Sequence, residues 1–357
     1  MKKNGGDIRT CIDYRIAIQP IKLTQYPLPL IDDLLIGFES GLWGVQSVLE
    51  AVHKTTGLVP FGEPQPTHEW QNYFDAGEYQ FGRLANCLVL GCDCLGKIQY
   101  LDATEADEPV LIANAICIHE EDFGTLWKHT DVFTAKGSVR RQRRLVIPFF
   151  VTVGNYDYGL YWYFYLDDKI ELECKATGIV FSSGLPEGEY DFATEMAPRL
   201  GAPCRQHLPS ARLDVVIDGN KCHVDELEVR RLPISPETPV GNAFKRVVTR
   251  LERESDAQRE ADNKLGRDWL IASSEKVKRL GRPTGYALYP EGAPLLLAED
   301  DSSIKRVQYA TKHLWVTQYA RGEMWAAGYT PNRHPGHAGL PAYTKANRSV
   351  DGEDIVV

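Results

Sequence analysis

The chain of 357 residues is long enough to bury a large core, as one large domain or as two smaller ones. Its hydrophobic content of 43% and charged content of 25% are those of an ordinary globular protein, and its net charge of −9 argues against a general nucleic-acid binder. No apolar run is long enough to span a membrane, and the opening residues lack the apolar core of a signal peptide. We therefore expect no membrane or nucleic-acid partner, and a cytoplasmic or peroxisomal location.

The first forty residues differ in character from the rest of the chain. Residues 2–15 (KKNGGDIRTCIDYR) and residues 26–35 (YPLPLIDDLL) resemble the opening of a retrotransposon-type reverse transcriptase. This resemblance ends near Gly41, and no polymerase palm follows it. We expect residues 1–40 to form a reverse-transcriptase-like fragment that packs poorly on the rest, with residues 41–58 as a linker.

Alternating apolar and polar residues recur through the remainder of the chain. Residues 152–163 predict two strands that meet at a Gly-Asn turn, and residues 211–217 with 222–224 predict a second hairpin. The charged run at residues 254–262 is compatible with a surface helix. Many strands and little helix predict a mainly β fold built as an antiparallel β-sandwich.

The cysteines form one suggestive pattern. The pairs Cys92-x-Cys94 and Cys117-x-His119 offer the ligand types of a four-coordinate zinc site. A disulfide within this set is the alternative interpretation. The two exclude each other, because a sulfur in a disulfide is not a thiolate ligand.

The motif Asn155-Tyr156-Asp157-Tyr158 is the most specific signal in the sequence, and it resembles the cofactor motif of the copper amine oxidases. Further matches to that family follow its order at residues 70–79, 116–124, 143–150 and 176–181. The resemblance implies that residues 59–357 form the family's catalytic domain, an antiparallel β-sandwich that is incomplete at its C-terminus. The family is homodimeric. It also places a disulfide at Cys94 and Cys117, which we favour over the zinc site.

The resemblance also implies a chemistry and the residues that perform it. In this family a primary amine is oxidised to an aldehyde, ammonia and hydrogen peroxide by dioxygen, through a Schiff base with topaquinone, a quinone made from the tyrosine at position 156. Asn155 lies beside that cofactor in the motif. Asp75 matches the general base, and the aromatic residues around it would raise its pKa toward the working pH. Tyr73 matches the gate of the substrate channel.

The copper site departs from the family pattern. The family binds copper with three histidines, two of them in a His-x-His strand, and three imidazoles suit Cu(II). Here that strand has Arg205-Gln206-His207, and arginine cannot lose its proton to become a ligand. The third family histidine lies beyond Val357, and Phe61 replaces a tyrosine that hydrogen-bonds the quinone. His207 is thus the one copper ligand that we expect, and we predict impaired activity.

A second metal site and two other functions complete the sequence-based hypotheses. Asp214 and Asp354 match a peripheral calcium-type site of the family, although two surface aspartates near turns would look the same. The alternative to an active enzyme is a non-catalytic pseudoenzyme or gene-fusion relic. A reverse-transcriptase-like polymerase is a remote alternative that rests on the N-terminal motif and on Tyr165-Leu166-Asp167-Asp168, which has the form of a polymerase catalytic turn. An ordinary hairpin turn is the stronger interpretation of the tetrad, because paired aspartates between apolar runs commonly form one.

Overall fold

The computed structural model describes most of the chain after residue 83 and three short strands before it. The described residues are 15–20, 57–60, 74–75, 84–104, 111–180, 182–185, 187–188, 191–290, 294–297, 299, 305–329 and 336–357. For residues 15–20, 57–60, 74–75, 104, 205 and 305–306 it describes the backbone alone.

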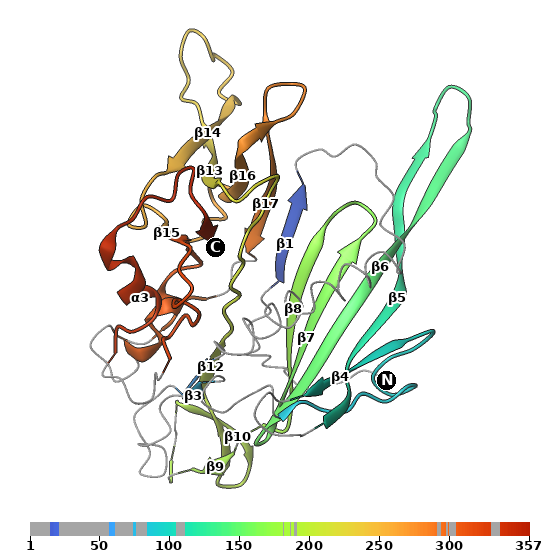
Figure 1. Cartoon of the computed structure of the whole chain (residues 1–357), viewed down its shortest axis with the longest axis vertical. Coiled ribbons are helices and arrows are strands. Elements are labelled where there is room, and N and C mark those ends of the chain that lie inside the picture. The colour runs from blue at the N-terminus through green and yellow to red at the C-terminus, as the bar shows by residue number, and fades with distance from the viewer. Residues whose placement is uncertain are drawn as a thin grey trace.

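A ten-stranded sheet dominates the molecule, and every pairing within it is antiparallel (Figure 1). Its strands, in spatial order, are β14 (Phe244–Leu251), β13 (Cys222–Arg231), β16 (Asp268–Val277), β17 (Pro283–Pro290), β1 (Arg15–Pro20), β8 (Ile170–Gly178), β7 (Tyr156–Tyr165), β6 (Gly137–Val153), β5 (Leu111–Thr130) and β4 (Gln99–Thr104). The mainly β, antiparallel fold class predicted from the sequence is confirmed.

Four small sheets accompany the large one. They are formed by β10 (Ala193–Ala197), β11 (Leu200–Pro203) and β9 (Ser183–Gly184); by β12 (Arg205–Leu208), β2 (Gly57–Pro60) and β3 (Phe74–Asp75); by β15 (Gln258–Arg259) and β18 (Leu314–Trp315); and by β19 (Thr317–Gln318) and β20 (Ile355–Val356). The described helices are short: α3 (Leu340–Tyr343) and the 3-10 helices η2 (Lys305–Thr311) and η4 (Thr344–Ala346).

The strand pair β6–β7 forms the centre of one core. Because side chains alternate across a strand, the odd-numbered residues of β6 from Leu145 to Val153 pack with Tyr158, Leu160 and Trp162 of β7 in one buried cluster. Tyr163 and Tyr165 pack with Val146 on the opposite face. The aromatic character of β7 is explained by this burial on both faces.

A second core lies at the other end of the large sheet. Cys222 and Val224 of β13, Trp269 and Ile271 of β16, and Leu288 of β17 are buried there with residues from the end of the chain, which are Leu314, Val316, Val350 and Ile355. The last residues therefore lie against β13, β16 and β17, as the position of the C-terminus shows (Figure 1).

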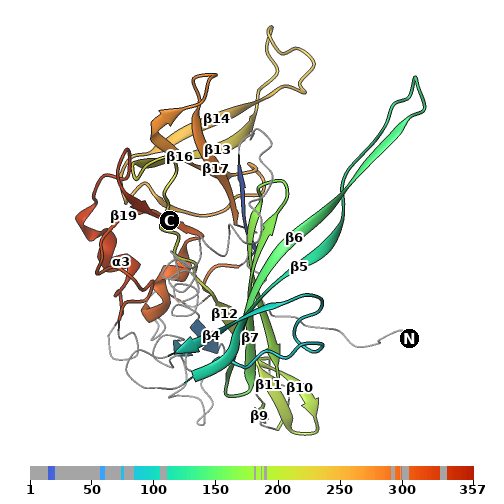
Figure 2. The same ribbon diagram turned by 45° about the vertical axis from the view of Figure 1, so that its right-hand side comes forward.

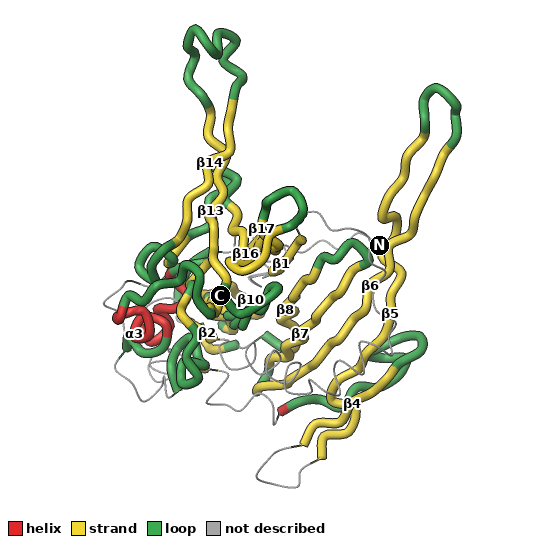
Figure 3. The backbone as a smooth tube through the Cα atoms, turned by 45° about the horizontal axis from the view of Figure 1, so that its top comes forward, coloured by secondary structure: helices red, strands yellow, loops and turns green. Residues whose placement is uncertain are grey.

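Two long hairpins extend well beyond the body of the molecule. One joins β5 to β6 and the other joins β13 to β14, and both project in the same general direction (Figures 1 and 3). The turned view separates the β5–β6 hairpin from the rest of the molecule (Figure 2).

Two local expectations differ from the structure. Residues 254–257 form a hydrogen-bonded turn and residues 258–259 form β15, whose backbone pairs with β18, so the expected surface helix at residues 254–262 is not formed. Residues 211–217 form no hairpin with β13, since Asp214 bridges to Val356 and β13 pairs with β14 and β16. Within residues 1–40 the structure describes the backbone of β1, which pairs with β8 and β17, and the packing of the fragment as a whole stays a prediction. The domain boundaries stay predictions.

The turn between β6 and β7 depends on a glycine in the neighbouring strand. Gly178 has a φ of +94°, and an added Cβ would lie 2.5 Å from the Asn155 carbonyl oxygen. Gly154 in the turn itself has a φ of +60°, but a Cβ there would meet nothing within 4 Å. At Gly178 both the positive φ and the close approach of the Asn155 carbonyl disfavour a side chain. At Gly154 only the positive φ does.

We predict that Gly178→Ala lowers the free energy of unfolding by about 3 kcal/mol or more, since it adds a clash with backbone to a strained φ. Gly154→Ala is the matched control, with a loss of about 1–2 kcal/mol from the left-handed conformation alone. Urea unfolding of the purified variants measures both. Equal losses would show that the close approach to Asn155 does not constrain the turn.

Candidate functional site

Tyr156 is placed by the turn that joins β6 to β7. It is the first residue of β7, and it pairs with Val153 on one side and with Gly178 on the other. Its half-buried ring packs against the β6–β7 core. Asn155 lies exposed in the turn, where its backbone carbonyl accepts a hydrogen bond of 2.7 Å from the Ile179 amide. The predicted strand, Gly-Asn turn and strand are confirmed.

His207 of β12 meets two tyrosines of β7. The Tyr158 hydroxyl and His207 Nδ1 are hydrogen bonded at 3.0 Å, and both side chains are buried. The ring of Tyr156 lies edge-on to the imidazole, with centroids 5.3 Å apart and an interplanar angle of 85°. Tyr156, Tyr158 and His207 thus form one cluster, although 49 residues separate the hydrogen-bonded pair in sequence.

The backbone of Asp75 belongs to the same small sheet as His207. Asp75 in β3 pairs with Gly57 in β2, and Gly57 pairs in turn with Leu208 in β12. Neighbouring strands lie about 4.8 Å apart, so the Asp75 backbone is about 10 Å from that of Leu208. The register aligns the position of the expected base with Leu208, the residue after His207, and β2 lies between the two strands. Tyr73 and Phe61 lie outside the described residues, as does the side chain of Asp75.

The described residues do not fit a copper site. Only one group of three or more potential ligands occurs among them, and it consists of Cys94, Cys117 and His119. His207 contributes one imidazole to the cluster with Tyr156 and Tyr158. Three imidazoles suit Cu(II), and no chemical step that depends on copper can be built on one.

The cysteine pair forms the expected bridge. Cys94 and Cys117 are joined by a disulfide, with their Cα atoms 7.3 Å apart. Cys92 is exposed and lies outside the group of potential ligands, so the four-ligand zinc site is not the arrangement found. The disulfide predicted from the resemblance is confirmed.

Asp214 and Asp354 lie near one another, because the bridge between Asp214 and Val356 draws the chain end to this segment. Burial raises the pKa of Asp214; the charge of Arg212 opposes the rise, and that of Asp354 adds to it.

The Tyr-Leu-Asp-Asp sequence at residues 165–168 has a structural explanation. Tyr165 is buried, and the two aspartates lie in the turn between β7 and β8.

Comparison with known proteins identifies the fold and its family. The copper amine oxidase enzyme domain matches residues 37–357. The histamine oxidase of Arthrobacter globiformis is 52% identical over an alignment of 341 residues, and the match covers 91% of this chain and 50% of that protein. The primary amine oxidase of Arthrobacter sp. strain P1 is 41% identical over 308 residues, or 84% and 47% of the two chains. The crystal structure of a copper-containing benzylamine oxidase from Hansenula polymorpha has a TM-score of 0.79 and 31% identity, over 85% of this chain and 49% of that chain.

The chain belongs to the copper amine oxidase family. It spans about half the length of the curated relatives reported above. Other relatives, from Nicotiana tabacum and Pichia angusta, are named as peroxisomal oxidases. None of the helices in the described part of this amine oxidase domain is long and apolar enough to cross a membrane.

Sequence reasoning did not anticipate the role of Tyr158 in this amine oxidase domain. Residues two apart on a strand share a face, so Tyr158 lies on the same side of β7 as Tyr156. That spacing was the available signal, but the partner on β12 could not be read from it. Tyr158 is hydrogen bonded to His207, and the His207 ring contacts Tyr156.

We predict that Tyr158→Phe destabilises the domain by about 1–3 kcal/mol, because it removes the hydroxyl from a buried hydrogen bond to His207. Tyr319→Phe is the control, since Tyr319 is exposed and a surface change of this kind stays within about 0.5 kcal/mol. Urea unfolding provides the measurement. A loss for Tyr158→Phe no larger than that for the control would count against the hydrogen bond.

Proposed function

We propose that this domain belongs to an enzyme that oxidises a primary amine, with Tyr156 as the precursor of topaquinone. The reaction consumes the amine, dioxygen and water, and it yields an aldehyde, ammonia and hydrogen peroxide. The observation that supports the proposal is the cluster of Tyr156, Tyr158 and His207, with the Asp75 backbone in the adjoining sheet. Topaquinone, when formed, supplies the electron sink that protein side chains lack.

The residue roles follow from the positions that match the family. Asp75 is the base that removes the proton from the carbon next to the amine nitrogen. In general, apolar neighbours raise the pKa of a carboxyl toward the working pH, which suits it to this role. Tyr73 gates the channel to that base. Asn155 precedes the cofactor residue and holds the turn through its backbone carbonyl, which accepts the Ile179 amide.

The names of the relatives support a primary amine and leave its identity open. They include a histamine oxidase, a primary amine oxidase and a benzylamine oxidase. A homodimer and a cytoplasmic or peroxisomal location belong to the same proposal. So does a calcium-type ion at Asp214 and Asp354, where two carboxylates would suit a hard cation. The reverse-transcriptase-like origin of residues 1–40 also stays a proposal.

We propose further that this chain is impaired as an oxidase by itself. Position 205 shares a face of β12 with His207, as the first histidine of a His-x-His pair must. Arginine there supplies no lone pair and keeps its positive charge, which disfavours a cation nearby. A pseudoenzyme with the family fold is the alternative that this substitution favours.

Arg205→His should tighten Cu(II) binding by about tenfold or more, because it adds a second imidazole and removes a like charge. Calorimetric titration of the metal-free chain measures the affinity, and electron paramagnetic resonance reports the nitrogen ligands. Arg321→His adds a histidine at an exposed turn, and it should leave the affinity near that of the unmodified chain. An equal gain from both variants would mean that position 205 is not at the copper site.

Quinone formation tests the function itself. The unmodified chain, given Cu(II) and air, should develop no chromophore that reacts with phenylhydrazine. A chimera that carries Arg205→His and is joined to the parts of the histamine oxidase that this chain does not match should develop the chromophore. Tyr156→Phe in the chimera should abolish the chromophore, and Asp75→Asn should keep it while slowing peroxide release by about 100-fold or more. A chromophore in the unmodified chain would refute the impairment, and one in the Tyr156→Phe chimera would refute the cofactor position.

A further inference from the structure

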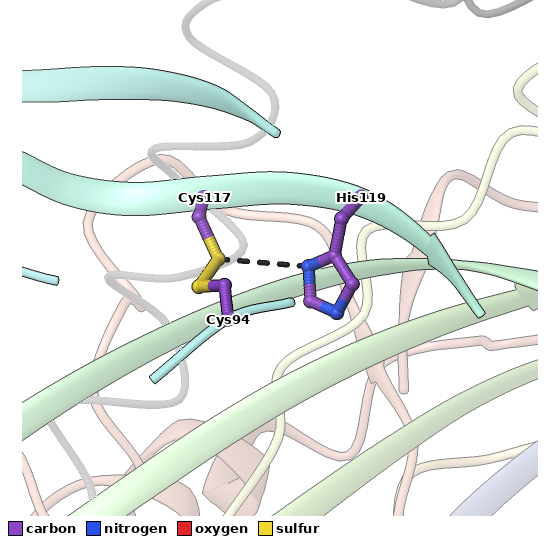
Figure 4. Close-up of side chains that lie close together, drawn as sticks. All are labelled: Cys94, Cys117 and His119. Carbon is purple, nitrogen blue, oxygen red and sulfur yellow. Dashed lines mark hydrogen bonds between the residues drawn. A yellow bond between two sulfur atoms is a disulfide. The ribbon is translucent and has the colours of Figure 1, made fainter. Parts of the chain in front are cut away.

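A buried cluster of potential ligands lies on the opposite face of the β5–β6–β7 sheet from the Tyr156 site. Cys117 and His119 are two residues apart on β5 and share a face, and Cys94 reaches them from the surface loop at residues 88–98 (Figure 4). Their exposures are 0%, 5% and 3%. The amine oxidase chemistry uses none of the three.

The two sulfurs are bonded to each other in the disulfide, and the His119 imidazole lies beside them. The Cys117 sulfur lies 3.6 Å from His119 Nδ1, and the ligand atoms of all three residues lie within 4.8 Å of one another. The close-up shows the imidazole turned so that this nitrogen faces the disulfide (Figure 4).

The orientation of the imidazole is fixed from its far side. His119 Nε2 lies 3.2 Å from Glu121 Oε1, and the other oxygen of Glu121 accepts bonds of 2.9 and 2.7 Å from the Arg144 guanidinium. Histidines that bind metals commonly donate their second ring N–H to a carboxylate, which sets the tautomer and leaves the first nitrogen as a ligand. The carboxylate of Glu121 provides that arrangement here.

We propose that, when the Cys94–Cys117 disulfide is reduced, Cys94, Cys117 and His119 bind a zinc-class divalent cation. Two thiolates and one imidazole are ligands that zinc prefers, and water completes the tetrahedron. Two molecules of a thiol reductant give two electrons and two protons to the disulfide and become a disulfide themselves. The cation then displaces the two protons from the cysteine thiols.

Charge and burial favour this exchange. Two thiolates without a counter-ion would be costly to bury, whereas two thiolates with a divalent cation are neutral overall. The hydrophobic side chains around the two cysteines are Leu88, which is buried with them, and the partly buried Ile98, Tyr100 and Phe150. Either the disulfide or the ion ties the loop at residues 88–98 to β5. The redox state of the solution therefore decides which of the two bonds holds that loop.

Cobalt(II) is the probe for this site, because tetrahedral thiolate coordination gives it both a charge-transfer band and intense visible absorption. The full chain is reduced with a phosphine, desalted without oxygen, stripped of metal and titrated with Co²⁺. We expect one tightly bound ion for each reduced chain, its displacement by one equivalent of Zn²⁺, and no such spectrum from the oxidised chain. Tyr156→Phe should bind identically, which separates this site from the proposed oxidase function.

Variants assign the ligands. Cys117→Ser should abolish the spectrum, and His119→Gln and Glu121→Gln should each weaken binding by about tenfold or more. Cys92→Ser should bind as the unmodified chain does, since Cys92 lies outside the group. Cys174→Ser and His223→Gln remove a buried thiol and a buried imidazole elsewhere and serve as matched controls. Circular dichroism verifies that each variant is folded.

The proposal is overturned if the reduced chain binds no cobalt in tetrahedral form. It is equally overturned if the folded His119→Gln and Glu121→Gln variants bind as tightly as Cys174→Ser. Loss of cobalt binding in Cys92→Ser would show that Cys92 is a ligand, and it would likewise refute the proposed three-residue site.

Discussion

The register between β6 and β7 is the constraint on which the rest of the structure depends. Val153 pairs with Tyr156 across a two-residue turn, and the pairing continues without a break to Arg144 and Tyr165. A shift by one residue would move every side chain of β7 to the other face. Tyr156 would then leave the core that it shares with Tyr158, and the ring contact with His207 would be lost. The close approach of Gly178 to the turn helps to hold this register.

The two faces of the β6–β7 strand pair differ in chemistry. On one face, Tyr156 and Tyr158 meet the imidazole of His207. On the other, the Arg144 guanidinium lies 3.8 Å from the centroid of the Tyr163 ring and binds Glu121. Burial alone would raise the pKa of Glu121, but hydrogen bonds from Arg144 and His119 outweigh it and the pKa is lowered. The carboxylate therefore stays ionised beside His119.

Family membership and activity are separate properties of this chain. The chain matches the copper amine oxidase enzyme domain and shares its β fold, yet position 205 holds an arginine, which cannot ligate a metal. Function depends on a few side chains in a site, and a fold tolerates their replacement more readily than the replacement of its core. The buried residues of β6 and β7 maintain the fold, whereas the proposed impairment rests on the single position 205.

The sequence by itself determined what depends on near neighbours. Alternating side chains predicted the mainly β fold, the Gly-Asn turn predicted the β6–β7 hairpin, and the motif at residues 155–158 indicated the family to which the chain belongs. Each of these signals lies within a short stretch of sequence, a single strand or turn, and periodicity and turn chemistry decide the conformation over such a stretch.

Only the tertiary structure decided what depends on distant partners. The pairing of β15 with β18 made residues 258–259 a strand, and the bridge from Asp214 to Val356 prevented the hairpin expected at residues 211–224. The hydrogen bond between Tyr158 and His207, and the convergence of Cys94 on His119, likewise join separate segments. A local pattern shows which residues can pair, but the partner is chosen by the burial and hydrogen bonding of the whole chain, which outweigh local propensity.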